Sequence, residues 1–332
     1  MKRIAIVGAG SWGTALGIIG ARAGHDIYLW SRNAGIVESI NRDHINAVYL
    51  TTERIPNGVR ATRDFVKALA GAELIILAAP SHAVRDLLTQ MSPALNEENI
   101  IVSATKGIEI ESGKRISQIV AEVVGPSRRF VCLSGPSFAK EVVERHPTAI
   151  VAASNDIEAA KLVQAELSFE NLRIYTNDDV VGTEIGGSVK NVMAIAAGMA
   201  YGLGYGANTI AALITRGLAE ITRLAVHEGG KVETLMGLAG LGDLVLTCTG
   251  SLSRNRFVGQ ELGKGKTVTE ITSGMNEIAE GIRTTKAVKR LADNLGIEMP
   301  ITNEVSAVIY DGKPARDAVT ELMTRRLREE GN

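Results

Sequence analysis

Short apolar runs rich in β-branched residues alternate with helical patterns through the first half of the chain. Gly, Pro, Asn or Asp bounds each run, and such punctuation is typical of buried strands. Helical patterns over residues 14–23, 83–91 and 116–123 lie between them. The alternation predicts βαβ units and an α/β domain, a mostly parallel sheet with helices on both faces. The strands are expected at residues 3–7, 26–30, 74–78, 100–103, 130–133 and 149–153.

Strand patterns stop near residue 179, and the remaining sequence is helical and interrupted by glycines. We expect residues 1–185 to form the α/β domain and residues 186–332 to form an all-α domain. No low-complexity tract separates the two, so a helix rather than a flexible tether is expected to join them. The clearer helices of the second half are predicted at residues 210–227, 255–262, 284–295, 301–310 and 315–326.

One uncharged stretch tests whether the chain enters a membrane. No charged residue lies between Lys190 and Arg216, and a membrane span takes about 20 residues. Glycines crowd the stretch, and asparagine, threonine and tyrosine side chains interrupt it. A membrane span would expose these polar groups to lipid. We therefore expect no membrane insertion, and instead two buried helices joined near residues 202–206.

The charge balance and the cysteine count of the chain exclude several classes of function. The 332 residues include 36 Lys and Arg against 37 Asp and Glu, a formal net charge of −1. No block of like charge is present, so no nucleic-acid partner is expected. Cys132 and Cys248 are too few for a disulfide framework, and no secretory leader pattern follows Met1, which favours the cytoplasm. Small-molecule chemistry without a metal site is expected.

The strongest local motif, Gly8-Ala9-Gly10-Ser11-Trp12-Gly13, follows the first predicted strand and opens the first helix. Gly8 permits a tight turn, Gly10 lets backbone N–H groups approach a pyrophosphate, and Gly13 allows close helix-to-strand packing. The helix N-terminus supplies positive potential at the same place. The motif predicts a dinucleotide bound by a Rossmann-like, doubly wound domain, with a merely structural glycine turn as the alternative.

The end of the second predicted strand bears on the choice of dinucleotide. NAD-selective sites usually place an acidic residue there to bind the ribose 2′-hydroxyl. This chain has Trp30-Ser31-Arg32-Asn33 and no acid. Arg32 can pair with a 2′-phosphate, which favours NADP over NAD; the alternative is a solvated Arg32 in a permissive site. Trp30 either flanks the adenine or packs in the core.

Three more strand ends carry polar residues where ligands of open α/β sheets bind. His82 lies just beyond the strand predicted at residues 74–78 and is a candidate acid or base, but an ordinary exposed role is favoured because nothing nearby in sequence orients it. Lys106 is either a solvated cap or an active-site cation. Gly135 and Ser137 follow another strand, and Ser137 is a candidate N-cap for a helix whose backbone amides suit a phosphate or a cofactor amide.

The second half contributes a lysine at the start of the uncharged stretch. Lys190 is predicted to open an apolar, buried helix, so it must find a partner or lose its proton, which favours a functional role. Asp243 follows Gly240-Leu241-Gly242 and can bond Lys190 or a substrate hydroxyl. Arg254 and Asn255 can hold a phosphate. Taken without context, each of these residues fits a surface loop as well.

The motifs occur in a fixed order: residues 8–13, Thr105-Lys106-Gly107, Ser134-Gly135-Pro136-Ser137, Lys190-Asn191, residues 240–244 and Arg254-Asn255. From Lys2 to about Leu322 the chain thereby resembles the bacterial type of NAD(P)-dependent glycerol-3-phosphate dehydrogenase, an enzyme family of phospholipid synthesis whose second domain is all-helical. The resemblance implies that Lys190 is the catalytic lysine. It implies substrate contacts from Lys106, Gly135, Ser137, Lys190, Asp243, Ser253, Arg254 and Asn255. It implies cofactor contacts from Ser11, Trp12, Arg32, Lys106, Ala139, Arg254, Ile278 and Glu280, beside Gly8, Gly10 and Gly13.

The reaction that the resemblance implies is reduction of dihydroxyacetone phosphate to sn-glycerol 3-phosphate with NADPH or NADH. Lys190 is expected to stabilise and protonate the alkoxide that forms at C2. Lys106 would lower the pKa of Lys190 and Asp243 would oppose that shift, and the sequence leaves open which prevails. The alternatives are a 3-hydroxyacid or ketopantoate reductase of the same architecture and a non-catalytic NAD(P)-binding sensor. A homodimer is one possible assembly.

Overall fold

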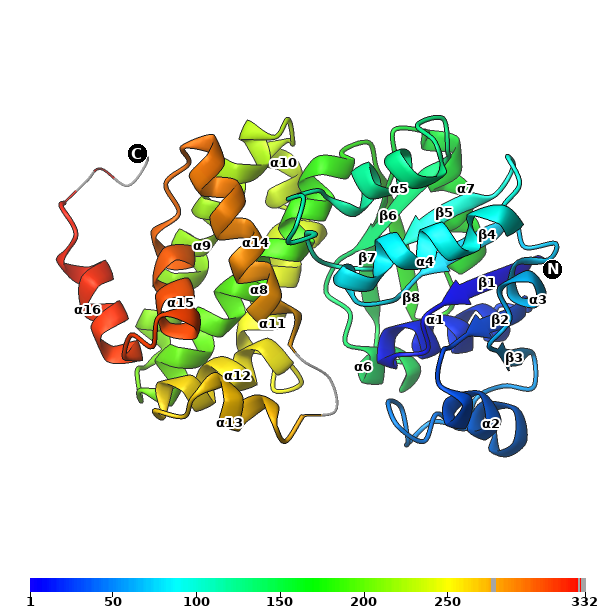
Figure 1. Ribbon diagram of the computed structural model, residues 1–332, viewed down its shortest axis with the longest axis horizontal. Coiled ribbons are helices and arrows are strands. Elements are labelled where there is room, and N and C mark those ends of the chain that lie inside the picture. Colours follow the sequence, from blue (N-terminus) through cyan, green and yellow to red (C-terminus); the bar gives the residue numbers. More distant parts are fainter. Residues whose placement is uncertain (276–278, 328, 330–332) are drawn as a thin grey trace.

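The computed structural model describes residues 1–275, 279–327 and 329. Figure 1 shows two bodies side by side: a sheet flanked by helices, and a group of helices around α8 (Val180–Gly202). We call them the sheet body and the helical body. The α/β and all-α organisation predicted from the sequence is confirmed.

An eight-stranded sheet forms the centre of the sheet body, in the order β3-β2-β1-β4-β5-β6-β7-β8. Neighbouring strands are parallel except β6 and β7, which are antiparallel. The order reverses between β1 and β4, which is the switch point of a doubly wound sheet. The strands are β1 (Arg3–Val7), β2 (Asp26–Trp30), β3 (Val59–Thr62), β4 (Leu74–Leu77), β5 (Ile100–Ser103), β6 (Phe130–Ser134), β7 (Thr148–Ala153) and β8 (Leu172–Asn177).

The sequence prediction missed two strands, β3 and β8. These are the two edge strands of the sheet, and each pairs on one side only. Exposed Arg60, Arg173 and Tyr175 interrupt the apolar run that marks a strand buried on both faces. The six strands that were predicted are confirmed, with small shifts at their ends.

Helices cover both faces of the sheet. Ile4 and Ile6 of β1 face one apolar core, and Ala5 and Val7 face the other, because successive strand residues point to opposite sides. The first core is closed by α1 (Ser11–Arg22), α2 (Ala34–Asp43), α6 (Ala139–Val143) and α7 (Ile157–Leu167). The second is closed by α3 (Phe65–Leu69), α4 (Val84–Met91) and α5 (Ile116–Val124).

The helical body is built around α8, which is buried along nearly its whole length. α12 (Arg254–Gly263) crosses α8 so closely that only glycine fits at the contact. A Cβ on Gly198 would lie 2.1 Å from the carbonyl oxygen of Arg256, and one on Gly259 would lie 2.0 Å from that of Ile195. The other elements are α9 (Ala207–His227), α10 (Val232–Leu235), the π-helix η3 (Leu238–Gly242), α11 (Asp243–Thr249), α13 (Val268–Thr272), α14 (Glu280–Leu295), α15 (Pro300–Tyr310) and α16 (Ala315–Thr324).

The uncharged stretch differs from its prediction in two ways. It forms parts of α8 and α9 with a turn between them, as expected, but α9 buries only one face. Lys190 lies in the middle of α8 rather than at its start, because Asp179 caps the helix and its Oδ1 accepts from the backbone N–H of Gly182 at 2.8 Å. The helix that joins the two bodies is α8, and the expected boundary after residue 185 falls within it.

One stretch of the described residues, Val232–Thr249, is long and apolar enough to cross a membrane, with a mean hydropathy of 1.3. It is divided among α10, η3 and α11, all of which contact α8. Of this stretch, 44% is buried inside the structure.

Candidate active site

The candidate active site lies where the carboxyl ends of β1, β5 and β6 face the helical body. The segments after these strands carry the site residues predicted in the first half of the chain, except Arg32, which follows β2. α8 brings its own residues close to them, because a Cβ on Gly187 would lie only 2.6 Å from Ser134 Oγ at the end of β6. α11 and the start of α12 complete the opposite side.

The turn between β1 and α1 fits a pyrophosphate. Gly8 has a φ of 121°, and a Cβ there would lie 2.6 Å from the carbonyl oxygen of Ala78. A Cβ on Gly13 would lie 1.9 Å from the carbonyl oxygen of Gly8, so α1 packs directly on the turn. Gly10 is the N-cap of α1 and makes no side-chain cap, which leaves the first-turn N–H groups for an anion.

Ser11, Trp12 and Ala139 lie around this turn. Ser11 Oγ donates to the carbonyl oxygen of Tyr49 at 3.0 Å, which ties the first turn of α1 to the segment between α2 and β3. Trp12 and Ala139 are half-buried against the same apolar core, one from α1 and the other from α6. Their predicted contacts with a cofactor stay predictions.

Two lysines, one from each body, meet at one buried carboxylate. Lys190 Nζ donates to Asp243 Oδ1 at 2.5 Å, and Lys106 Nζ donates to Asp243 Oδ2 at 2.6 Å. Lys190 Nζ also donates to Thr247 Oγ1 at 2.7 Å. Asp243 is 1% exposed and Lys190 is 6% exposed. We call Lys106, Lys190, Asp243 and Thr247 the lysine cluster. With two cations and one anion, it carries an excess of positive charge.

Burial governs the protonation of Lys190. Loss of hydration lowers the pKa of Lys190 from 10.5 to about 8, Asp243 opposes that shift, and Lys106 adds to it. Asp243 therefore acts more strongly than Lys106, which the sequence left open, but desolvation outweighs both. Lys190 can thus exchange a proton near neutral pH. Burial also raises the pKa of the neighbouring Cys248 to about 12, so that its thiol stays protonated.

Gly135 and Ser137 occupy the loop between β6 and α6. The carbonyl oxygen of Gly135 accepts from Lys106 Nζ and from Ser137 Oγ, both at 3.1 Å. The prediction that Ser137 caps α6 is wrong. Phe138 is the N-cap and makes no side-chain cap bond, because the hydroxyl of Ser137 turns back to Gly135. This loop therefore supports Lys106 through a backbone oxygen.

Ser253 and Asn255 hold the start of α12. Ser253 is the N-cap, and its Oγ accepts from the backbone N–H of Arg256 at 3.2 Å. The buried Asn255 donates from Nδ2 to Asn191 Oδ1 at 2.9 Å, and its Oδ1 accepts from the backbone N–H of Gly281 at 2.9 Å. Asn255 thereby joins α8, α12 and α14 beside Lys190.

Glu280 crosses from the helical body to the sheet body. Its Oε2 accepts from Ser81 Oγ at 2.9 Å, and its Oε1 accepts from the Ser81 backbone N–H at 3.3 Å. Ser81 begins the short helix η1 (Ser81–Ala83) that follows β4. Arg254 is exposed at the first position of α12 and lies in electrostatic range of Glu280. Ile278, also predicted as a cofactor contact, lies outside the described residues.

Arg32 and Trp30, at the end of β2, lie in different surroundings. Arg32 is exposed just beyond the strand. Trp30 is a core residue: its ring stacks on Phe65 with centroids 4.2 Å apart, and its Nε1 donates to the carbonyl oxygen of Arg63 at 2.9 Å. Of the two alternatives for Trp30, packing is therefore the one observed. His82 is exposed, as expected.

The sequence analysis did not single out Thr247 or Ser81. Thr247 lies four positions after Asp243 on α11, and this spacing places both side chains on one helix face. That spacing was an available signal. Ser81 has no local signal, because its partner Glu280 is distant in the sequence. Among the described residues, no group of three or more His, Cys, Asp or Glu side chains is placed to hold a metal ion.

Family models match most of the chain in two parts. Residues 3–160 match the NAD-dependent glycerol-3-phosphate dehydrogenase N-terminus, and residues 179–320 match the C-terminus of the same family. A relative from Koribacter versatilis, named glycerol-3-phosphate dehydrogenase (NAD(P)+), is 52% identical over 329 residues, which cover 98% of each chain.

Solved structures agree with this match. The crystal structure of a glycerol-3-phosphate dehydrogenase from Coxiella burnetii has a TM-score of 0.94 and 41% identity, covering 98% of this chain and 99% of that chain. A ketopantoate reductase from Ralstonia eutropha has a TM-score of 0.62 and 18% identity, covering 97% and 99%, which is a likeness of fold alone. The matches along nearly the whole chain show that it belongs to the glycerol-3-phosphate dehydrogenase family.

Proposed function

We propose that the protein catalyses the reversible, NAD(P)H-dependent reduction of dihydroxyacetone phosphate to sn-glycerol 3-phosphate. The observation that carries this proposal is the lysine cluster, in which two ammonium groups share one buried carboxylate between the two bodies. A phosphorylated ketone is an anion, and the excess positive charge of the cluster complements it. Membership of the family supports the same reaction.

Lys190 is the residue proposed to exchange the proton at C2 of the substrate. When bound, the nicotinamide cofactor supplies the hydride for the reduction. The oxygen on C2 then gains negative charge, which an adjacent ammonium stabilises and protonates. With a pKa of about 8, Lys190 is mostly protonated at pH 7 and can take the proton back in the oxidation direction. Asp243 and Thr247 fix the position of its nitrogen.

The start of α12 is proposed to bind the substrate phosphate. Arg254 is exposed there, and a guanidinium pairs well with phosphate oxygens. Ser253 and Asn255 are bonded within the protein, yet a hydroxyl that accepts one hydrogen bond can still donate one, and an amide nitrogen has two hydrogens. Binding the phosphate here would use energy remote from C2 to position the carbonyl. Lys106, Gly135 and Ser137 stay predicted substrate contacts.

The cofactor is proposed to bind at the turn from Gly8 to Gly13, with NADP favoured through Arg32. Arg32→Ala is expected to raise KM for NADPH about tenfold, the loss of one charge-assisted contact, and to change KM for NADH little. NADH is the internal control because it lacks the 2′-phosphate. Equal losses for both cofactors would contradict a role of Arg32 in the choice between them.

A parallel assay tests the reaction. NADPH and NADH oxidation is followed with dihydroxyacetone phosphate, with ketopantoate and with the ketone forms of 3-hydroxyacids. Turnover is expected with dihydroxyacetone phosphate. Activity with the carboxylate substrates alone would favour a reductase of the same architecture. Stoichiometric cofactor binding without turnover on any substrate would favour a sensor.

The proposed setting is the cytoplasm, where the product would supply the glycerophospholipid backbone. Both cysteines are free and buried, which suits a reducing compartment. A homodimer stays a prediction from the sequence, and sedimentation equilibrium of the purified protein checks it.

A further inference from the structure

The loop between β5 and α5 connects the two bodies and carries Lys106. At its beginning, Thr105 Oγ1 donates to the carbonyl oxygen of Ala79 at 2.8 Å, within the sheet body. Farther along, Ile108 is 2% exposed in the core of the helical body, and Ile110 packs beside it. The position of the Lys106 ammonium therefore depends on how this loop is held.

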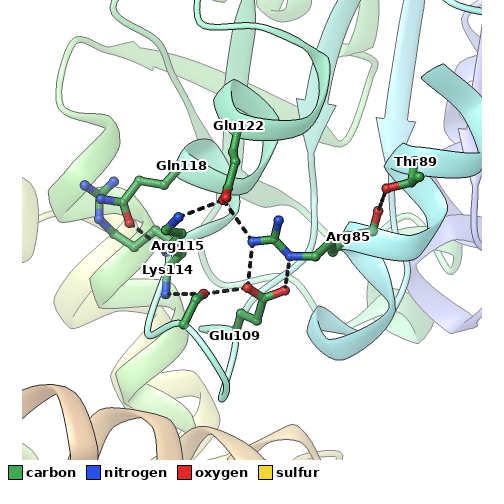
Figure 2. Close-up of polar contacts among 8 residues, drawn as sticks. Arg85, Thr89, Glu109, Lys114, Arg115, Gln118 and Glu122 are labelled. Atoms are coloured by element: carbon green, nitrogen blue, oxygen red, sulfur yellow. Dashed lines mark hydrogen bonds and ion pairs between the residues drawn. The ribbon is translucent and has the colours of Figure 1, made fainter.

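A set of mostly charged residues holds the part of the loop that follows Ile108 (Figure 2). Glu109 receives two parallel hydrogen bonds from Arg85 of α4, from Nε to Oε1 and from Nη2 to Oε2, both at 2.8 Å. Glu122 of α5 accepts from Arg85 at 3.0 Å and from Lys114 at 2.8 Å. Ser112 Oγ also donates to Glu109. We call Arg85, Glu109, Ser112, Lys114 and Glu122 the loop network.

The Arg85–Glu109 pair has the geometry of a strong contact. Glu109 is 7% exposed, and two parallel hydrogen bonds fix both the distance and the orientation of its carboxylate. Arg85 lowers the pKa of Glu109 against the opposing effect of burial, and Ser112 adds to the lowering, so the carboxylate stays charged. The backbone of Glu109 is also bound: its carbonyl oxygen accepts from Gly113 at 2.9 Å, and its N–H donates to Lys114 at 3.0 Å.

We propose that Arg85 is a positioning residue for the reaction, because through Glu109 it fixes the loop and thereby holds Lys106 against Asp243. Only Gly107 and Ile108 separate Lys106 from Glu109 in the chain. Arg85 itself bonds Glu109 and Glu122 and acts on the lysine cluster through the loop. This inference rests on the proposed function of the lysine cluster.

A double-mutant cycle tests the coupling between Arg85 and Lys106. The full-length protein is compared with Arg85→Ala, Lys106→Ala and the double variant in both reaction directions. Arg85→Ala is expected to lower kcat/KM about tenfold, within the range measured for coupled residues. The same substitution in the Lys106→Ala background is expected to cause no further loss, because no ammonium is left to position. Losses that multiply would overturn the proposal.

A pH profile separates positioning from a loss of stability. Lys106 lowers the pKa of Lys190, so a displaced Lys106 lets that pKa rise. The other groups facing Lys190, which are Asp243, Thr247 and Cys248, are unchanged in the Arg85 variant. The acid limb of kcat/KM for glycerol 3-phosphate oxidation is therefore expected to move to higher pH in Arg85→Ala. An unmoved limb would overturn the proposal.

Two further variants test whether the effect belongs to the Arg85–Glu109 pair or follows from the loss of any arginine–carboxylate pair. Glu109→Gln weakens the same pair from the loop side and is expected to reproduce the shift of the acid limb. Arg129→Ala is the matched control: Arg129 Nε donates to Asp156 at 2.8 Å, but Arg129 precedes the amino end of β6, whereas the carboxyl end of β6 faces the site. It is expected to keep the wild-type profile.

Hydrogen exchange gives a readout that does not depend on turnover. In Arg85→Ala, amides of residues 104–115 are expected to exchange faster than in the wild type, and unchanged exchange would overturn the proposal. Wild-type protein that does not turn over dihydroxyacetone phosphate contradicts the proposed function instead. An active wild type whose Arg85→Ala variant keeps its activity and profile contradicts the positioning role alone.

Discussion

The lysine cluster and the loop network use similar residues but differ in charge balance and burial. The loop network sets Arg85 and Lys114 against Glu109 and Glu122, and all but Glu109 are partly exposed. The lysine cluster sets two lysines against Asp243 alone; Asp243 and Lys190 are buried, and Lys106 is partly exposed. As a result, Arg85 lowers the pKa of Glu109, whereas the pKa of Lys190 is lowered by burial despite its partner.

This difference is the physical basis for proposing that similar side chains form a support in one place and a reaction site in another. Balanced pairs stabilise the charged forms of both partners, so their protons stay in place and their geometry is constant. A buried excess of cations destabilises one charged form, which brings a proton within reach of transfer and attracts an anion. Four substitutions test this comparison.

Lys190→Ala is expected to have the largest effect. Removing a positioned proton donor typically costs about 10³ in rate, so kcat for dihydroxyacetone phosphate reduction should fall by about that factor. Lys289→Ala, which removes an exposed lysine paired with Asp293, is the control and should keep wild-type activity. A folded Lys190→Ala protein with unchanged turnover would show that the lysine cluster has no greater part in the reaction than the loop network.

Asp243→Asn removes the only anion of the lysine cluster. Two cations then lie near each other without compensation, and the free energy of unfolding is expected to fall by about 3 kcal/mol in denaturant titrations. Asp243 raises the pKa of Lys190, so its loss should move that pKa below about 8. The acid limb of kcat/KM for the oxidation then shifts to lower pH, opposite to the shift expected for Arg85→Ala. A shift upward would contradict the assigned charges.

Thr247→Val keeps the volume of the side chain but removes an acceptor from Lys190. The loss of one hydrogen bond to a charged group is expected to cost about 1.5 kcal/mol, which is about a tenfold loss in kcat. Thr249→Val, on the same helix but exposed, serves as the control. Equal effects of both substitutions would indicate a general response of α11.

Lys114→Ala is expected to have the smallest effect. Lys114 and Glu122 are 40% and 45% exposed, and such surface pairs contribute under about 1 kcal/mol to the free energy of unfolding. The difference from the wild type should shrink further at high salt, because exposed pairs are screened. A larger loss would mean that the loop network is coupled more tightly than its exposure indicates.

The sequence was informative about the fold where burial is complete. β1, β4 and β5 are covered on both faces, so their residues form apolar runs that stand out from the surrounding pattern. β3 and β8 lie at the edges, and the exposed Arg60 and Arg173 break the apolar run. Partial exposure is therefore what concealed these strands.

Of the contacts in the candidate site, the sequence offered the bond between Lys190 and Asp243 as one alternative, but it did not predict the bond from Lys106. Lys190 stood out because a charge in an apolar helix needs a partner, and the resemblance of the chain to a known family indicated the same residue. That Asp243 would bridge both lysines depends on how α11 meets α8 and the β5–α5 loop, which no local pattern determines. The cap role of Ser137 failed for a similar reason, because Gly135 offered its hydroxyl a competing acceptor.

The continuity of α8 has a consequence for changes in chain length. Gly187 meets the end of β6, Lys190 reaches Asp243, and Gly198 contacts α12, so three positions along one helix are assigned to different partners. Each residue inserted into an α-helix rotates everything after it by about 100° and advances it by about 1.5 Å. A single insertion between Gly187 and Lys190 would turn the lysine and the α12 contact away together. The angular phase of this one helix thus sets the alignment of both bodies, and insertions are expected to be tolerated only beyond its ends.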